Sequence, residues 1–335
     1  MSLFSLVFAL LLEQLRPLSY QRVVRSRLLL LADWLEKRFN AGHRQHEVLA
    51  WCFSVVGVSL LSGIIFFALH QFSPFLAWCW NVLMLYLTLG FRQFSHYYTD
   101  IQFALRMGDL AQARQHLAAW RGRAADELSS TEVARLAIEE ALTASHRHVF
   151  GVLVGFVLLP GPCGAVLYRM AAFFAEYWGS RSQTRQADGV DSVLLRGVQA
   201  GVQDNLQVEA QGISDFGLFS RQAFALIDYL PLRITAAGFA IVGNFEDAVY
   251  CWRTQAATWF DAGIGIVLAS GAGALGVRLG MPVLDHGELA DRAELGTGAE
   301  ADVDFMQSAI GLVWRALLLW LIVLLFFGFA HFLSV

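Results

Sequence analysis

The sequence predicts an all-α fold: a polytopic transmembrane helical bundle with broken or re-entrant helices and a cytoplasmic helical hairpin. The first supporting observation is composition, which is 56% hydrophobic and 16% charged, with a mean hydropathy of +0.51. A soluble domain is about 45–50% apolar and about 25% charged. The second is that several uncharged stretches approach the ~20 residues that a membrane-spanning helix needs.

A transmembrane hairpin is predicted over residues 48–90. Val48–Leu69 and Pro74–Gly90 carry no charged residue, and arginines are frequent on both flanks. Because cytoplasmic loops of membrane proteins are enriched in Lys and Arg, we expect Glu13–Glu47 and Arg92–His148 in the cytoplasm. The same rule places the C-terminus outside. The expected location is the inner (plasma) membrane of a bacterium, crossed more than once.

The segment 91–148 is polar and favours helices, so it supplies the predicted cytoplasmic hairpin. Ser129, Ser130 and Thr131 precede Glu132. This pattern predicts a helix start, because hydroxyl side chains cap helix N-termini and acidic residues stabilise the first turn.

Residues 149–282 are predicted to form apolar helices with two breaks, at Pro160–Gly164 and at Leu230-Pro231. Irregular backbone at membrane depth is tolerated where it lines a cavity or packs on protein. An acidic loop at 283–309 and a C-terminal transmembrane helix at 310–335 complete a single membrane domain. No stretch shows the alternation expected of a β-strand.

The motif Gly271-x-Gly273-x-x-Gly276 matches the glycine pattern of dinucleotide-binding loops. Such a loop requires a βαβ unit with an acidic residue further along, and Arg278 and Pro282 follow instead. Small residues at this spacing let membrane helices approach closely. We therefore expect close packing or a turn that lines a site.

Three charged residues lie within or at the edge of apolar segments: Arg169, Asp228 and Arg233. An ionisable side chain in a membrane is costly and usually faces a partner or a watery cavity. The sequence is compatible with two interpretations of these residues: a functional site, or a structural ion pair. The cysteines stand singly without a metal-ligand spacing, so no metal site is predicted. The net charge of −4 argues against nucleic-acid binding.

Short motifs spread along most of the chain resemble the CobD/CbiB family of membrane proteins, a superfamily shared with the AmpE proteins. In chain order, the matching stretches are Leu35–Asn40, Ala104–Leu110 with Ala113-Arg114, Glu132–Glu140, Gly164–Arg169, Tyr229–Ala236, Gly243–Glu246 and Gly271–Gly280.

The resemblance implies an adenosylcobinamide(-phosphate) synthase, which joins aminopropanol or its phosphate to adenosylcobyric acid by an amide bond, using ATP and Mg²⁺. It implies a lipid bilayer and a corrinoid substrate as partners and leaves self-association into a homo-oligomer open. The acids at matching or nearby positions are candidate catalytic residues: Glu36, Glu140 and Asp228. The candidate phosphate-binding or substrate-binding residues are Arg169, Arg233 and Arg278.

A second function follows from positions where the family's Asp-, Asn- and Glu-rich motifs are replaced, as at Ala144–His148 and Ala171–Glu176. Asp and Glu are the usual oxygen ligands of a Mg²⁺ site. The alternative is therefore a non-catalytic inner-membrane factor like AmpE, in β-lactamase induction or cell-wall signalling.

Overall fold

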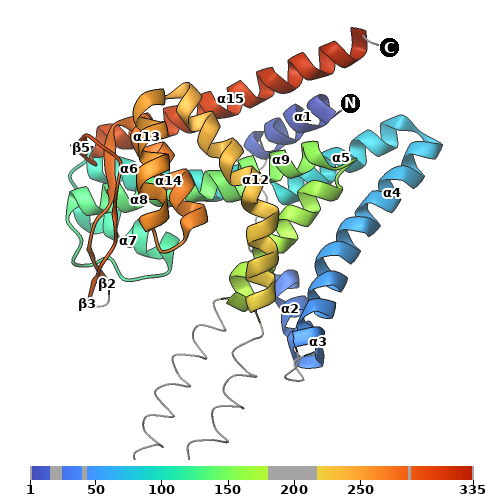
Figure 1. Ribbon diagram of the computed structural model, residues 1–335, viewed down its shortest axis with the longest axis horizontal. Helices are drawn as coiled ribbons and strands as arrows, with labels where there is room; N and C mark the ends of the chain where they lie inside the picture. Colours follow the sequence, from blue (N-terminus) through green and yellow to red (C-terminus); the bar gives the residue numbers. More distant parts are fainter. Residues whose placement is uncertain (1, 16–24, 40–43, 180–216, 286–287, 334–335) are drawn as a thin grey trace, which may run out of the picture. The chain divides into compact units, whose positions relative to one another are not determined.

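The structure is a computed structural model of the 335-residue chain that describes residues 2–15, 25–39, 44–179, 217–285 and 288–333. The chain divides into two compact units (Figure 1). Unit 1 comprises Met1–Pro17, Leu89–Val154 and Tyr229–Val335, and unit 2 comprises Leu18–Thr88 and Gly155–Asp228. Most described residues are helical, which confirms the predicted all-α class.

Among the described residues, four helices are long and apolar enough to cross a membrane. They are His46–Phe72, Ser130–Leu158, Leu218–Val242 and Val303–Ala330. Their exposed side chains include many large hydrophobic ones, such as Leu60, Ile64, Leu325 and Phe326. Exposed apolar surface on this scale is expected where lipid replaces water.

Unit 2 contains the predicted apolar hairpin. Its helices are α2 (Ser26–Phe39), α3 (Arg44–Trp51), the π-helical turn η2 (Cys52–Gly57), α4 (Val58–Phe72), α5 (Pro74–Thr88) and the helical residues 163–179. Ser73 is extended and separates α4 from α5. Pro74 then opens α5, a position where its missing N–H has no helical partner to lose. The core of unit 2 gathers aromatic and aliphatic side chains such as Trp51, Phe174 and Trp178.

The predicted break after α9 (Gly151–Leu158) is present. Residues 159–162 are bends and turns, and the helix resumes at residue 163. Helix α9 and the helix 163–179 pack so tightly against each other that a Cβ on Gly164 would lie 1.8 Å from the carbonyl oxygen of Gly155. Only glycine permits this approach.

The predicted break at Leu230-Pro231 is wrong. Residues Leu218–Val242 form one helix, α12, with Pro231 inside it. Proline removes one backbone hydrogen bond from a helix and usually kinks it, without necessarily ending it. At the start of this helix, the buried carboxylate of Glu47 accepts hydrogen bonds from the backbone N–H groups of Gly217 (2.8 Å) and Ser220 (3.2 Å).

Unit 1 is built on α8, which contacts α6, α7, α14 and α15. The bounds of its helices are α1 Ser2–Leu15, α6 Phe91–Arg106, α7 Leu110–Arg121, α8 Ser130–Ser145, η3 His146–Phe150, α13 Phe245–Gln255, η4 Ala256–Thr258, α14 Ala262–Leu275 and α15 Val303–Leu333. Tyr98 on α6 donates a hydrogen bond to the carbonyl of Met306 on α15 at 2.8 Å. Burial raises the pKa of Tyr98 well above its ordinary value, so the phenol stays a neutral donor.

The predicted helix start before Glu132 is confirmed by a capping box. The Ser129 side chain accepts from the Glu132 backbone N–H, and the Glu132 carboxylate accepts from the Ser129 backbone N–H at 2.7 Å. Each group satisfies a donor that the first helical turn would otherwise leave unbonded.

The expectation that no strand occurs is wrong for the segment after α14. Its strands are β1 (Val277–Gly280), β2 (Val283–Asp285), β3 (Glu288–Ala290), β4 (Glu294–Leu295) and β5 (Ala299–Glu300). Strand β1 pairs with β4 antiparallel and with β5 parallel, and β2 pairs with β3 antiparallel. Strands this short carry too few residues to show alternation.

The C-terminal helix α15 begins at Val303, earlier than the 310 expected from hydropathy. Asp302 explains the difference, because its carboxylate accepts from the backbone N–H groups of Asp304 (2.9 Å) and Phe305 (2.8 Å). The cap extends the helix into a sequence too polar to be counted as part of an apolar span.

The glycine motif packs helices, as expected, and forms no dinucleotide loop. Gly271 and Gly273 lie within α14, and Gly276 ends it in the left-handed conformation with φ 67°. A Cβ on Gly273 would lie 2.4 Å from the backbone oxygen of Asp247 on α13. The small residues therefore let α13 and α14 lie side by side (Figure 1).

Candidate functional site

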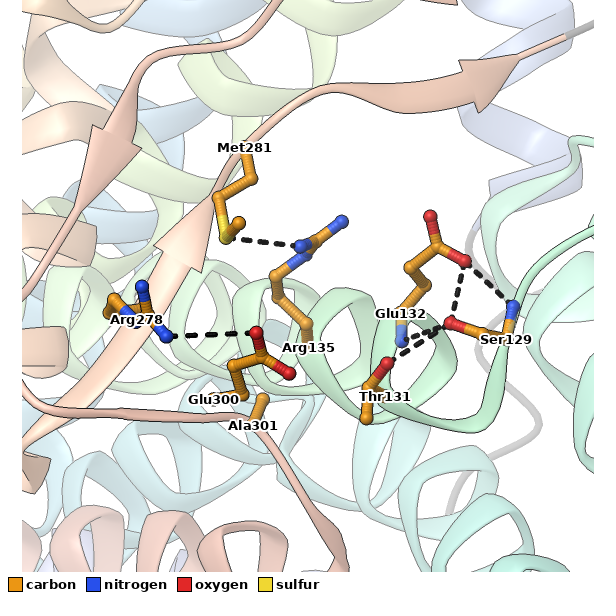
Figure 2. Close-up of a pocket in the computed structure, with 8 residues that line it drawn as sticks. All are labelled: Ser129, Thr131, Glu132, Arg135, Arg278, Met281, Glu300 and Ala301. Carbon is orange, nitrogen blue, oxygen red and sulfur yellow. Dashed lines mark hydrogen bonds and ion pairs between the residues drawn. The ribbon is translucent and has the colours of Figure 1, made fainter.

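A polar pocket of about 300 Å³ lies in unit 1, where the N-terminus of α8 faces β1 and β5. Its lining residues are Ser129, Thr131, Glu132, Arg135, Arg278, Met281, Glu300 and Ala301 (Figure 2). In Figure 2 guanidinium groups and carboxylates alternate across the pocket, in the order Arg278, Glu300, Arg135 and Glu132. We call it the Arg135 pocket.

Arg135 is the most deeply placed charge of this pocket, with 8% of the residue exposed. It lies on α8 one turn after Glu132. Its guanidinium contacts the sulfur of Met281 at 3.3 Å and the carbonyl oxygen of Pro282 at 3.5 Å. Thioether sulfur is a weak acceptor, and 3.5 Å is beyond the usual hydrogen-bond range. Within the described part of the chain, its buried Nε has no hydrogen-bond partner.

Arg278 and Glu300 face each other because β1 and β5 pair in parallel with these two residues in register. Their ion pair measures 3.6 Å, and Arg278 also approaches Glu294 at 3.7 Å. The glutamate side chains are more than half exposed. Exposed ion pairs contribute little stability, about 0–1 kcal/mol. Arg278 can therefore exchange these partners for a ligand at small cost.

Glu139 holds the strand segment against α8 beneath the pocket. Its carboxylate accepts from the backbone N–H of Gly280 at 2.8 Å and pairs with Arg292. The Arg292 guanidinium lies over the Trp259 ring, 4.8 Å from its centroid. The next residue after Gly280, Met281, has a φ of 65°, a left-handed conformation that is uncommon for non-glycine residues. These contacts fix β1 and thereby place Arg278.

Three of the predicted site residues lie in unit 1, and the structure does not gather them at one point. Arg278 lines the Arg135 pocket. Glu140 forms an ion pair with Arg121 at 3.3 Å. Arg233 donates to the carbonyl of Tyr229 at 2.8 Å and stacks on that ring, 3.5 Å from its centroid.

The other three predicted residues lie in unit 2, and all are buried: Glu36 on α2, Arg169 in the helix 163–179, and Asp228 on α12. The Tyr168 hydroxyl donates to Asp228 at 2.8 Å. The catalytic and substrate-binding roles of all six residues stay predictions.

Sequence reasoning did not single out Arg135, Glu132 and Glu300 as site residues. Arg135 and Glu132 lie inside the family-like stretch Glu132–Glu140, three positions apart, which is the spacing of neighbours on one helix face. No sequence pattern marked Glu300 as a site residue, because only the pairing of β5 with β1 brings it next to Arg278.

The fold and the pocket define a helical membrane protein with a small site of mixed charge. A family model described as CobD/Cbib protein matches residues 15–192. A "Cobalamin biosynthesis protein CobD" of Stutzerimonas stutzeri is 34% identical over 90% of this chain and 89% of its own length. The chain belongs to the CobD/CbiB family.

Two further relatives have the same kind of name. A "Cobalamin biosynthesis protein CobD" of Chromobacterium violaceum is 32% identical over 71% of this chain and 67% of its own length. A "Cobalamin biosynthesis protein CbiB" of Salmonella typhimurium is 24% identical over 87% of this chain and 85% of its own length. The comparison with solved structures gave no match. These relatives give no support to the AmpE-like alternative.

Proposed function

We propose that this protein acts in cobalamin biosynthesis by joining aminopropanol or its phosphate to adenosylcobyric acid through an amide bond. The observation that carries the proposal is its similarity over 90% of the chain to a relative named for cobalamin biosynthesis. The Arg135 pocket supports it, because two guanidinium groups beside two carboxylates suit a small substrate that carries a phosphate and an amine.

Amide formation joins the amine nitrogen to the carbonyl carbon of an activated carboxylate. The leaving group departs with the C–O electron pair, and the amine gives up a proton. The chain's task is therefore to hold the amine and provide a base. Among the described residues, no group of three or more His, Cys, Asp or Glu side chains could hold a metal ion. We assign no residue to ATP or Mg²⁺.

Genetic complementation tests this function. Expressed in a strain that lacks the synthase, the wild-type chain should restore growth under conditions that require corrinoid synthesis. The exposed Arg253→Gln variant should do the same, because Arg253 lies on α13 outside the pocket. If wild-type protein accumulates in the membrane and growth still fails, the proposed function is rejected.

The proposed location is the bacterial inner membrane, crossed more than once, with Glu13–Glu47 and Arg92–His148 in the cytoplasm and the C-terminus outside. The support is the arginine bias around the uncharged hairpin. Gln112 on α7 is exposed and suits a test by cysteine labelling. In a chain whose four cysteines are replaced, Gln112→Cys should react with a membrane-impermeant thiol reagent only after the cells are opened. Labelling in intact spheroplasts would overturn this orientation.

A further inference from the structure

Helix α2 in unit 2 leaves one of its sides exposed. The exposed residues on this side are Arg27, Leu30, Trp34, Lys37 and Arg38. They follow one another at steps of three and four residues, apart from the neighbours Lys37 and Arg38, and this spacing places them on one side of a helix. Leu30 and Trp34 are 71% and 55% exposed. We call these five residues the α2 face.

The remainder of α2 is packed into unit 2. Ala32 and Leu35 are fully buried in its core. The two acids of the helix are also withdrawn from the α2 face. Asp33 accepts a hydrogen bond from the Tyr177 hydroxyl at 2.7 Å, and Glu36 is 5% exposed. The α2 face therefore carries three positive charges and no carboxylate.

The α2 helix lies beside the start of a membrane span. It ends at Phe39, and the candidate span His46–Phe72 follows closely in the chain. It also contacts α3, which contains the first residues of that span (Figure 1). Large apolar side chains of the span are exposed from its first turns onward, such as Leu49 and Phe53. A helix held against the end of a span is expected at the level of the lipid headgroups.

The side chains of the α2 face suit that level. Leu30 and Trp34 occupy its middle, and basic residues stand at both ends. Tryptophan is enriched at membrane–water interfaces, where its ring is apolar and its N–H is polar. Arginine and lysine keep their apolar stems in the apolar region and extend the charged group to the headgroups. A polar acidic partner would satisfy the charges but would leave the two large apolar side chains in water.

We infer that the α2 face rests on the bilayer surface and binds the phosphate groups of anionic lipids. Its two apolar side chains then lie among the acyl chains, and its three basic side chains lie at the headgroups. With the orientation proposed above, this is the cytoplasmic leaflet, whose negative surface attracts basic segments next to a span. The contact does not depend on the proposed reaction, so either can fail without the other.

Quenching by brominated lipids tests the inference in the full chain reconstituted into vesicles. The four native cysteines are replaced, and a fluorophore is attached to Leu30→Cys. The same brominated acyl chains are supplied on phosphatidylcholine in one set of vesicles and on phosphatidylglycerol in the other, at equal mole fraction. Both should quench, because bromine acts only on a nearby fluorophore. The phosphatidylglycerol should quench at least about twofold more strongly, because basic side chains concentrate anionic lipid around them.

The triple variant Arg27→Gln/Lys37→Gln/Arg38→Gln should lose the preference for phosphatidylglycerol and keep the quenching by phosphatidylcholine. A charge-matched control, which should keep the preference, replaces three exposed arginines of unit 1 by glutamine: Arg106, Arg123 and Arg253. Salt keeps the test decisive if the triple variant does not fold. Raising the ionic strength from about 0.1 M to about 1 M shortens the screening length from about 10 Å to about 3 Å, so the preference should fall.

Equal quenching by the two lipids at low salt would overturn the inference, and so would a preference that survives in a folded triple variant. Absence of quenching by both lipids would overturn it as well. Energy transfer between differently labelled copies would then assign the α2 face to a second copy of the chain, and its absence would leave the face in water or on another protein.

Discussion

Replacing Glu139 by glutamine should destabilise unit 1 by about 3–5 kcal/mol, the usual cost of removing one partner from a buried ion pair. The Glu139 and Arg292 side chains are 8% and 15% exposed, so the arginine would keep its charge in a place that excludes water. The substitution also weakens the acceptor for the Gly280 backbone N–H. We expect poor accumulation in the membrane and a lower temperature of thermal unfolding in detergent.

The double variant Glu139→Gln/Arg292→Gln separates the ion pair from general damage. Removing both charges leaves no unpaired charge at position 292 and also removes the repulsion between Arg292 and the buried Arg135, so the double variant should be more stable than Glu139→Gln alone. Glu246→Gln is the matched control, because Glu246 is an exposed glutamate on α13 of the same unit. Additive losses in the double variant would show that the pair does not act as a unit.

Tyr168→Phe should destabilise unit 2 by about 1.5–3 kcal/mol, the range for a hydrogen bond to a charged group. The Tyr168 hydroxyl donates to Asp228 at 2.8 Å, and both residues are buried. Phenylalanine keeps the ring and its edge contact with Phe224, so the loss reports on the hydroxyl. Thermal unfolding of the purified variants measures it.

Asp228→Asn is the second single variant of a double-mutant cycle with Tyr168→Phe. If Tyr168 acts through the carboxylate, Tyr168→Phe should cost less in the Asp228→Asn background than in the wild type. Tyr250→Phe is the control, because Tyr250 on α13 is exposed. An identical cost of Tyr168→Phe in both backgrounds would show that the hydrogen bond contributes nothing beyond the two side chains taken separately.

The helices that depend on local signals were predicted well from the sequence. Ser129 and Glu132 form the expected cap, and the Pro160–Gly164 break occurs where proline and glycine interrupt an apolar run. The break at Pro231 was predicted from the same kind of signal and is absent. Whether a proline ends a helix or only kinks it depends on how the surrounding helices pack, which a local motif does not contain.

The candidate site likewise contains residues that the sequence could indicate and residues that only the packing reveals. Arg278 could be selected from the sequence, because it stands within the family-like stretch Gly271–Gly280. Arg135 looked like one more charge on a polar helix. Its burial to 8% exposure comes from the strand segment that covers α8, and that segment is fixed by the Glu139 contacts with Gly280 and Arg292.

The sequence by itself determined the helical class, the membrane character, the apolar hairpin and the family, since these depend on composition, on uncharged runs and on motifs read in order. Only the tertiary structure decided that Glu300 lies opposite Arg278 and that Glu132 and Arg135 share a pocket with them. The physical reason is that strands of two to four residues have no pattern of their own. Pairing between β1 and β5 brings together charges that lie far apart along the chain.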